Sequence, residues 1–383
     1  MSFSIPKSPL KKSSMKYITE YRDSALAKEI TKKIAEEVKP DRTYRLMEFC
    51  GGHTHVLSRY GLENILPKNI QMIHGPGCPV CVMPIGRIDS AMELAVKHKV
   101  ILCTYADTMR VPASGGISMM KAKAQGADIR MVYSVSDAYR IAKENPDKEV
   151  VFFAIGFETT TPPTAVVLKL AKAENIKNFS VFCNHVLTPA AMKHILDNPN
   201  GVKIDGIVGP AHVSTVIGSN PYKEVAEKYK KSVVVAGFEP LDMLQAILML
   251  VRQINEDRAE VENEFIRAVK PEGNVKAINL MKEVFDIRDS FEWRGLSSVP
   301  NSALKLNKEY AFFDAEKRFD LPYRRVPDNK ACECGAILRG EKHPSDCRAF
   351  GTVCTPENPI GSCMVSSEGA CAAYYTYGRK TKN

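Results

Sequence analysis

The chain has 383 residues and lacks long hydrophobic runs. Its longest apolar stretches, such as residues 150–155 and 246–251, are much shorter than the roughly 20 residues of a membrane-spanning helix, so no membrane partner is expected. Residues 1–16 contain lysine, serine and proline but no apolar segment of the kind that a secretion signal requires. We therefore expect a cytoplasmic protein.

Signatures of nucleotide chemistry are also missing. The sequence has no Gly-x-x-x-x-Gly-Lys-Ser/Thr phosphate loop, no Gly-x-Gly-x-x-Gly fingerprint and no Cys-x3-Cys-x2-Cys motif of radical S-adenosylmethionine enzymes. The formal net charge is +9, and outside the chain ends basic residues alternate with acidic ones, as on solvated helix faces. We expect neither nucleotide-driven chemistry nor a nucleic-acid partner.

Cysteine, by contrast, is plentiful, with 11 residues. Because thiols stay reduced in the cytoplasm, a group of cysteines there is more typical of metal binding or catalysis than of structural disulfides. Cys103 and Cys183 lie within apolar runs and are predicted to be buried packing residues. The other cysteines form an N-terminal and a C-terminal group: Cys50, Cys78 and Cys81, then Cys332, Cys334, Cys347, Cys354, Cys363 and Cys371.

Short apolar runs alternate with stretches of helical period. The apolar runs predict strands at residues 44–49, 100–106, 150–155, 179–183, 204–208 and 232–236. The stretches between them predict helices at residues 89–97, 136–143, 164–173, 190–196 and 222–230. This alternation is typical of βαβ units with parallel sheets, so we predict an α/β fold. Residues 241–284 have a helical pattern, and after Asn329 the composition indicates a small separate domain that needs a bound cofactor for stability.

The C-terminal cysteines follow the spacing Cys332-x14-Cys347-x6-Cys354-x16-Cys371. Structural zinc sites usually take ligands in close pairs, whereas well-separated thiolates in glycine- and proline-rich loops suit a 4Fe-4S cluster better. Zinc and disulfides stay open as alternatives. A disulfide between the two remaining cysteines, Cys334 and Cys363, would place an oxidisable dithiol beside the metal, although these two could instead be ligands in place of two others.

The N-terminal group combines two motifs. Cys78 and Cys81 form a Cys-x-x-Cys turn, which lowers thiol pKa and favours redox exchange or metal binding. Cys50 follows a predicted strand and precedes His53 and His55, a thiol and imidazole set that suits Fe(II) or Cu(I). Ligands bind at the carboxyl ends of parallel strands, and four further candidates follow predicted strands: His185, His212, Glu158 and Glu239.

Taken together, these motifs resemble the HypD family of hydrogenase maturation factors. The resemblance covers residues 44–377 and rests on segments 49–55, 75–84, 156–162, 184–191, 209–218, 237–244, 293–302 and 332–375. It implies two Rossmann-like α/β domains with parallel sheets plus a small C-terminal iron-sulfur domain. The implied boundaries are an N-terminal arm and helix at 1–40, α/β domains at 41–148 and 149–255, a helical connector at 256–328 and a 4Fe-4S domain at 329–383.

The resemblance also implies roles for the cysteines. Residues that match the cluster ligands are Cys332, Cys347, Cys354 and Cys371. A redox relay, similar to that of ferredoxin:thioredoxin reductase, would run from Cys334 and Cys363 to Cys78 and Cys81. Cys50, with His53 beside it and with Cys78 and Cys81 as further candidate ligands, would hold the iron that receives cyanide and carbonyl ligands. The implied partners are a small HypC-type chaperone and a HypE-type cyanide donor, with this chain a monomer within their complex.

This chemistry agrees with the residues. Release of cyanide from a thiocyanate, RSCN + 2e⁻ → RS⁻ + CN⁻, consumes two electrons, which a dithiol and a cluster together can supply. Two other functions stay open at this point. One is a stand-alone disulfide reductase that uses Cys78 and Cys81, and the other is a zinc-stabilised interaction scaffold.

Overall fold

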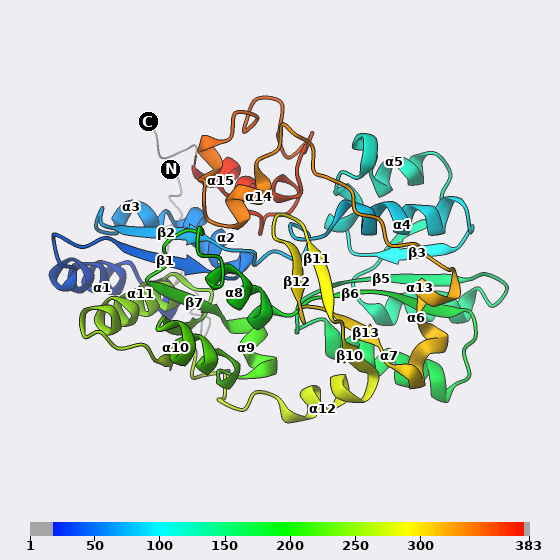
Figure 1. Ribbon diagram of the computed structural model, residues 1–383, viewed down its shortest axis with the longest axis horizontal. Helices are drawn as coiled ribbons and strands as arrows, with labels where there is room; N and C mark the ends of the chain where they lie inside the picture. Colours follow the sequence, from blue (N-terminus) through cyan, green and yellow to red (C-terminus); the bar gives the residue numbers. More distant parts are fainter. Residues whose placement is uncertain (1–17, 379–383) are drawn as a thin grey trace, which may run out of the picture.

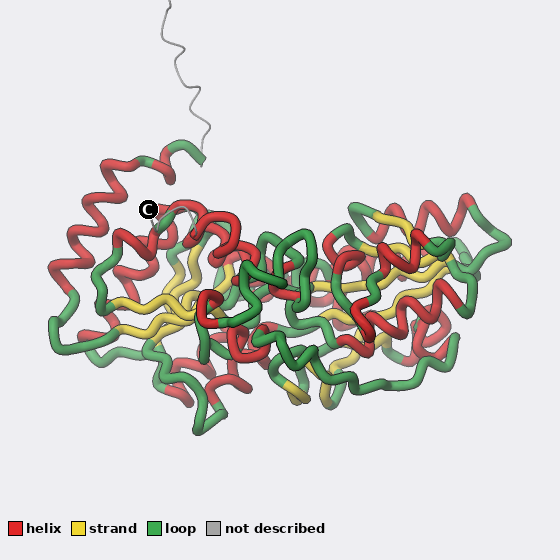
Figure 2. The backbone as a smooth tube through the Cα atoms, turned by 90° about the horizontal axis from the view of Figure 1, so that it is seen from above, coloured by secondary structure: helices red, strands yellow, loops and turns green. Residues whose placement is uncertain are grey.

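The computed structural model describes residues 18–378. Residues 1–17 of the expected N-terminal arm and residues 379–383 of the expected C-terminal domain lie outside the described part. Two sheets occupy the two ends of an elongated molecule, and the C-terminal residues form a small domain over the junction between them (Figure 1, Figure 2). Within residues 18–378, no helix is both long enough and apolar enough to cross a membrane.

The first sheet has five parallel strands in the order β2-β1-β7-β8-β9. Its strands are β1 (Tyr44–Glu48), β2 (Ile70–His74), β7 (Gly206–Pro210), β8 (Ser232–Ala236) and β9 (Val261–Asn263). One face packs against α1 (Ser24–Glu37), α2 (Gly51–Tyr60) and α11 (Pro240–Asn255). The other packs against α8 (Thr188–Leu196), α9 (Ala211–Ile217) and α10 (Lys223–Tyr229). Both faces are therefore covered, as is usual for a parallel sheet.

The second sheet has four parallel strands in the order β4-β3-β5-β6. Its strands are β3 (Ile101–Thr104), β4 (Ile129–Met131), β5 (Val150–Gly156) and β6 (Phe179–His185). Helices α4 (Ile85–Val96) and α5 (Met119–Ala124) cover one face, and α6 (Val135–Glu144) and α7 (Thr161–Ala173) cover the other. Both β5 and β6 are buried along their whole length, and the β5 sequence is accordingly a continuous apolar run, whereas β6 also contains the buried polar residues Ser180, Asn184 and His185. The predicted α/β architecture with parallel sheets is confirmed.

Each sheet combines strands from both of the α/β domains that the sequence predicts. Residues 41–148 contribute β1 and β2 to the first sheet but β3 and β4 to the second. Residues 149–255 are divided in the same way, so the boundary expected near residue 148 does not separate the sheets. The physical reason is that an apolar run specifies a buried strand but not its neighbour. Here β5 pairs with β3, while β7 returns to pair with β1.

The segment 256–328, expected to be a helical connector, is mostly strand and loop. Its only α-helices are α12 (Val275–Val284) and α13 (Ala315–Arg318). Two antiparallel pairs lie between them, β10 (Phe285–Ile287) with β13 (Leu304–Leu306) and β11 (Ser290–Trp293) with β12 (Ser297–Pro300). Aromatic and β-branched residues such as Phe291 and Val299 are buried there, which explains the departure from helix.

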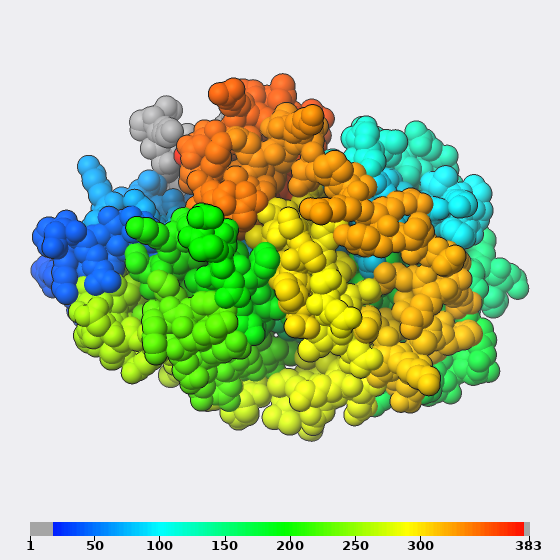
Figure 3. Space-filling view, viewed as in Figure 1, coloured from blue at the N-terminus to red at the C-terminus, as the bar shows by residue number. Residues whose placement is uncertain are grey.

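The C-terminal domain consists mainly of loops around α14 (Cys334–Leu338) and α15 (Ala370–Tyr377). It lies against the β11-β12 hairpin (Figure 3), and Gly340 packs on Met47 of β1 and Ile73 of β2. One continuous apolar core joins Met47 of the first sheet, Phe153 of the second, Trp293 of the hairpin and Cys363 of this domain. The remaining short helices are α3 (Leu62–Ile65), η1 (Glu20–Arg22), η2 (Asp107–Arg110), η3 (Ser114–Gly116), η4 (Asn220–Tyr222), η5 (Lys308–Phe313), η6 (Pro344–Asp346) and η7 (Ser362–Met364).

Candidate functional site

Cys50 lies where the strand order of the first sheet reverses. The chain leaves β1 toward β2 on one side and continues from β7 toward β8 on the other, and ligands of open parallel sheets bind at such a switch point, beyond the carboxyl ends of the strands. Cys50 follows β1 and caps α2, its sulfur accepting a hydrogen bond from the Gly52 N–H at 3.3 Å. His212 follows β7, and its Nδ1 lies 3.2 Å from the Cys50 sulfur.

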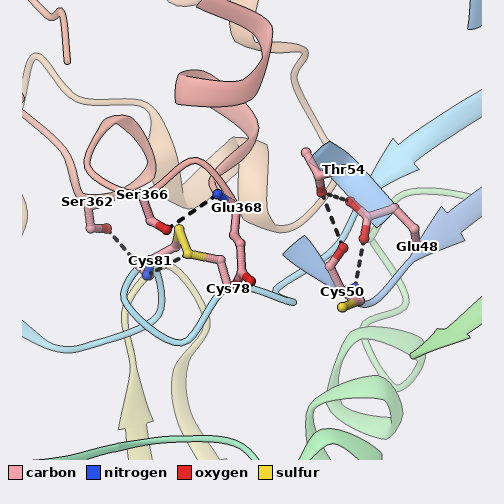
Figure 4. Close-up of a disulfide and its surroundings, with 8 residues drawn as sticks. All are labelled: Glu48, Cys50, Thr54, Cys78, Cys81, Ser362, Ser366 and Glu368. Atoms are coloured by element: carbon pink, nitrogen blue, oxygen red, sulfur yellow. Dashed lines mark hydrogen bonds between the residues drawn. A yellow bond between two sulfur atoms is a disulfide. The ribbon is translucent and has the colours of Figure 1, made fainter. Parts of the chain in front are cut away.

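A fully buried carboxylate fixes the start of α2. Glu48 ends β1, and its Oε2 accepts a hydrogen bond from the Cys50 N–H at 2.8 Å. Its Oε1 contacts the Thr54 hydroxyl and lies 3.0 Å from His74 Nδ1 (Figure 4). Burial, with the negative charges of Glu368 and Glu48, raises the pKa of the Cys50 thiol. Cys50 is therefore protonated unless a cation binds beside it.

His53 has an unused ring nitrogen near the same switch point. Its Nε2 lies 2.9 Å from the carbonyl of Ala236 and, since a carbonyl only accepts, carries the proton. Its Nδ1 is buried and has no hydrogen-bond partner. Burial lowers the pKa of His53 and lowers that of His212 to about 4, so both rings are neutral. Phe238 packs against both rings, with ring centroids 5.0 Å from His53 and 5.4 Å from His212.

The Cys-x-x-Cys loop packs directly on Cys50. Cys78 and Cys81 are joined by a disulfide, and both are buried (Figure 4). A Cβ at Gly77 would lie 2.2 Å from the Cys50 nitrogen, so only glycine allows this approach. The Gly77 carbonyl also accepts a hydrogen bond from the Gly51 N–H at 3.0 Å. The dithiol loop and the Cys50 loop therefore form one unit.

The C-terminal domain packs on the other side of the same loop. The hydroxyl of Ser362, which immediately precedes Cys363, donates to the Cys81 carbonyl at 2.7 Å. Ser362 is fully buried (Figure 4). On the Cys50 side, the backbone of Glu368 is so close to Gly51 that a Cβ at Gly51 would lie 2.7 Å from the Glu368 carbonyl oxygen. The domain thus spans from the disulfide loop to Cys50.

The six C-terminal cysteines converge as free thiols. The thiols of Cys332, Cys363 and Cys371 are in hydrogen-bonding contact with that of Cys334, and this contact lowers the pKa of Cys332 to about 7. The disulfide considered for Cys334 and Cys363 is not formed. The Cys354 sulfur accepts a hydrogen bond from the Ile360 N–H at 3.4 Å, and burial, with the nearby Cys332 and Cys347, raises the pKa of the Cys354 thiol.

The donor set suits an iron–sulfur cluster, the resident group that the family resemblance implies. A Cβ at Gly361 would lie 2.2 Å from the Cys332 sulfur and 2.5 Å from that of Cys334, so this glycine backbone lines the thiols. Four soft thiols beside backbone amides are the ligands and donors of such clusters. Over residues 18–378, no set of three or more His, Cys, Asp or Glu side chains is arranged to hold a single metal ion.

Other residues predicted from the sequence lie elsewhere. His55 is on α2 but faces Tyr377, with ring centroids 5.3 Å apart. His185 ends β6 of the second sheet and lies 3.0 Å from the Thr164 hydroxyl, and Glu158, just after β5, accepts hydrogen bonds from the N–H and hydroxyl of Thr188. Glu239 forms an ion pair with Arg22. Cys103 and Cys183 are fully buried packing residues, as predicted.

Sequence reasoning missed three residues that shape the site. Glu48 had a detectable signal, because a carboxylate directly after the apolar residues Leu46 and Met47 of a predicted strand is costly to bury and so marks a function. Ser362 and Gly361 had none, since their contacts form only when residues distant in sequence pack together.

Comparison with known proteins agrees with this arrangement. A family model named HypD and described as the hydrogenase formation hypA family matches residues 25–378. The hydrogenase maturation factor HypD of Cupriavidus necator is 64% identical over 370 residues, covering 95% of this chain and 98% of that protein. The HypD of Escherichia coli (strain K12) is 44% identical over 369 residues, covering 95% and 98%. The chain therefore belongs to the HypD family of hydrogenase maturation factors.

Proposed function

We propose that this protein is the scaffold on which the iron-dicyanide-carbonyl group of nickel-iron hydrogenase is assembled. The observation that carries the proposal is the position of the Cys78–Cys81 loop. Gly77 packs that loop against Cys50 on one side, and the Ser362 hydrogen bond attaches it to the C-terminal cysteines on the other. In this proposal Cys50 binds the iron, the Cys78–Cys81 pair supplies two electrons and the C-terminal cysteines hold the cluster. The Cys78–Cys81 loop lies between the other two groups.

In this proposal Cys50 binds the iron that is the substrate. Its thiol is protonated in the metal-free protein, so metal binding releases a proton. His212, neutral and 3.2 Å from the sulfur, is placed to take that proton. The buried Nδ1 of His53, which has no hydrogen-bond partner, could donate a second electron pair to the iron. The remaining iron ligands come from a partner and from cyanide and carbonyl.

Cyanide transfer requires a two-electron reduction that the dithiol can supply. The balanced step is R′SCN + 2 RSH → R′SH + HCN + RSSR, where the two RSH groups are Cys78 and Cys81. The sulfur–carbon bond of the thiocyanate breaks, the sulfur–sulfur bond forms, and the thiols provide both protons and both electrons. The disulfide in the structure corresponds to the product of this step.

A cluster held by Cys332, Cys347, Cys354 and Cys371 would supply electrons one at a time when bound. This chain's own residues do the rest. Cys334 and Cys363, buried beside those ligands, are the thiols through which the electrons return to the Cys78–Cys81 pair. Ser362 and Gly77 hold that pair in place.

We further propose that the protein acts in the cytoplasm as one chain of a larger complex. A small HypC-type chaperone would contribute a second iron ligand, since Cys50 alone leaves most coordination positions open. A HypE-type protein would deliver the thiocyanate. Each relative's name supports only the general role in hydrogenase maturation.

The test is anaerobic purification with metal analysis and visible spectroscopy. Wild type should contain about four irons per chain with broad visible absorbance, and Cys354→Ala should lose both. Cys103→Ala, which removes a buried thiol distant from the site, should keep both. A colourless protein with stoichiometric zinc would contradict the proposal.

The iron site is tested separately, in complex with the small chaperone. Infrared bands of bound cyanide and carbonyl should be present in wild type and absent in Cys50→Ala, while the variant keeps its visible absorbance. Loss of that absorbance would contradict separate cluster and iron sites.

The observed disulfide also favours a second function, a stand-alone disulfide reductase without mononuclear iron. That function predicts normal reduction of a protein disulfide by Cys50→Ala and no infrared bands in the wild-type complex. It would replace the scaffold function if both results were obtained.

A further inference from the structure

Arg294 is a buried cation between the disulfide loop and the C-terminal cysteines. It follows β11 and is 4% exposed. Its backbone N–H donates to the Val82 carbonyl at 2.8 Å, one residue beyond Cys81. Its side chain lines a groove of about 600 Å³ that also contains Cys332. Arg294 thus contacts the disulfide loop and borders the cluster ligands at the same time.

The guanidinium group of Arg294 has a hydrogen-bond partner for only some of its N–H groups. Its Nε donates to Asp328 Oδ1 at 2.5 Å, and the Asp328 side chain is 30% exposed. Its Nη1 is buried and has no hydrogen-bond partner. A buried charged group is costly unless its N–H donors are satisfied, so an unpartnered Nη1 indicates a negative group that binds nearby.

Arg294 and Asp328 both line the groove that contains Cys332, together with its neighbours Glu333 and Gly335. A buried cation and a partly exposed carboxylate are therefore both placed beside the cysteine that is the first of the proposed cluster ligands.

We propose that Arg294 is a positioning residue that raises the reduction potential of the centre held by the C-terminal cysteines, and that Asp328 lowers it. A cluster gains one negative charge when it accepts an electron. A fixed cation beside it stabilises the reduced form, and a fixed carboxylate destabilises it. In this proposal the unpartnered Nη1 of Arg294 donates a hydrogen bond to the negatively charged, sulfur-rich cluster.

This inference rests on the proposed function, because it requires a cluster. It explains why a residue outside the cysteine motifs is a buried arginine. The potential of the centre decides whether it can reduce the Cys78–Cys81 disulfide. Arg294 donates a hydrogen bond to the disulfide loop and lines the groove that contains Cys332. It is therefore suited to adjust the reduction potential of the cluster to that of the disulfide.

The test is a redox titration of the full-length protein, purified anaerobically and followed by visible absorbance and electron paramagnetic resonance. The variants are Arg294→Gln, Arg294→Lys and Asp328→Asn. At a fixed potential we expect Arg294→Gln to reduce the ratio of reduced to oxidised cluster about tenfold, which is about 59 mV for one electron. Arg294→Lys should stay near wild type, and Asp328→Asn should shift in the opposite direction.

The outcomes separate the two proposals. If wild type contains no cluster, the proposed function fails. If wild type contains a cluster and both Arg294→Gln and Asp328→Asn keep its potential, only the role of Arg294 is refuted. Equal shifts in Arg294→Lys and Arg294→Gln would also refute it, because the charge would then not be the cause. Should Arg294→Gln not bind a cluster, Asp328→Asn still decides through the sign of its shift.

Discussion

Replacement of Gly77 by alanine tests the contact between the disulfide loop and Cys50. A Cβ at position 77 would lie 2.2 Å from the Cys50 nitrogen, 2.4 Å from its Cα and 2.5 Å from the carbonyl carbon of Phe49. Favourable contacts between carbon atoms are about 3.5–4.0 Å, so the loop must move by about 1 Å or more. All three atoms belong to the backbone, so no side-chain rotation relieves the overlap.

The expected loss can be worked from these contacts. Overpacking of a well-packed interior costs about 1–3 kcal/mol, and displacement of the loop also removes the Gly51–Gly77 hydrogen bond, worth about 1 kcal/mol. We expect Gly77→Ala to lower the free energy of unfolding by about 2–4 kcal/mol. Cys50, which is 1% exposed in the structure, should become reactive toward thiol reagents.

The assay combines denaturant unfolding, followed by circular dichroism, with mass spectrometry of thiol labelling at Cys50. Gly201→Ala is the matched control. The nearest atom to a Cβ there would be the Asn198 carbonyl oxygen at 3.1 Å, and all three nearest atoms belong to Asn198 rather than to the Cys50 loop or the disulfide loop. A loss of less than about 0.5 kcal/mol for Gly77→Ala, within the range of neutral surface changes, would refute the packing argument, as would an unreactive Cys50.

Two further predictions concern single buried groups. Ser362→Ala leaves the Cys81 carbonyl without its hydrogen-bond donor and should lower the free energy of unfolding by about 1–3 kcal/mol in denaturant. Ser367→Ala, at an exposed position, is the control and should not lower it. Equal effects of the two changes would show that the hydrogen bond is unimportant. Burial raises the pKa of Glu158 from 4.5 to about 7, so its contribution to stability is full below pH 4.5 and is lost as pH rises through 7. The free energy of unfolding of wild type should therefore fall by about 3 kcal/mol relative to that of Glu158→Gln between pH 4.5 and 8. A difference between the two proteins that does not change with pH would contradict this.

The strands that the sequence predicts correctly are those buried on both faces. Residues 150–155 and 232–236 are continuous apolar runs, and both form central strands. The prediction missed β2, because one of its residues is exposed and two are half-buried, so it has no apolar run. It also missed β4 and β9, which have three residues each and lie at sheet edges.

The candidate site was predictable only in part. Cys50 and His212 each follow a predicted strand, so both could be expected at carboxyl ends, but their 3.2 Å contact depends on β1 and β7 being neighbours. That pairing joins residues separated by about 160 positions, and no local pattern specifies it. Docking of the C-terminal domain through Ser362 is unpredictable for the same reason.

The interleaved topology explains why the disulfide loop is the centre of the site. The chain leaves the first sheet after β2, forms the loop with Cys78 and Cys81, and enters the second sheet through α4 and β3. The loop is therefore the first crossing between the sheets, which the chain makes again in reverse from β6 to β7, and buried contacts hold it on both sides. A change in this loop when the disulfide is reduced must act on Cys50 and on the C-terminal domain together, because neither contact has room to absorb it. Reduction of the Cys78–Cys81 disulfide would therefore change the packing of two segments that are distant from it in sequence.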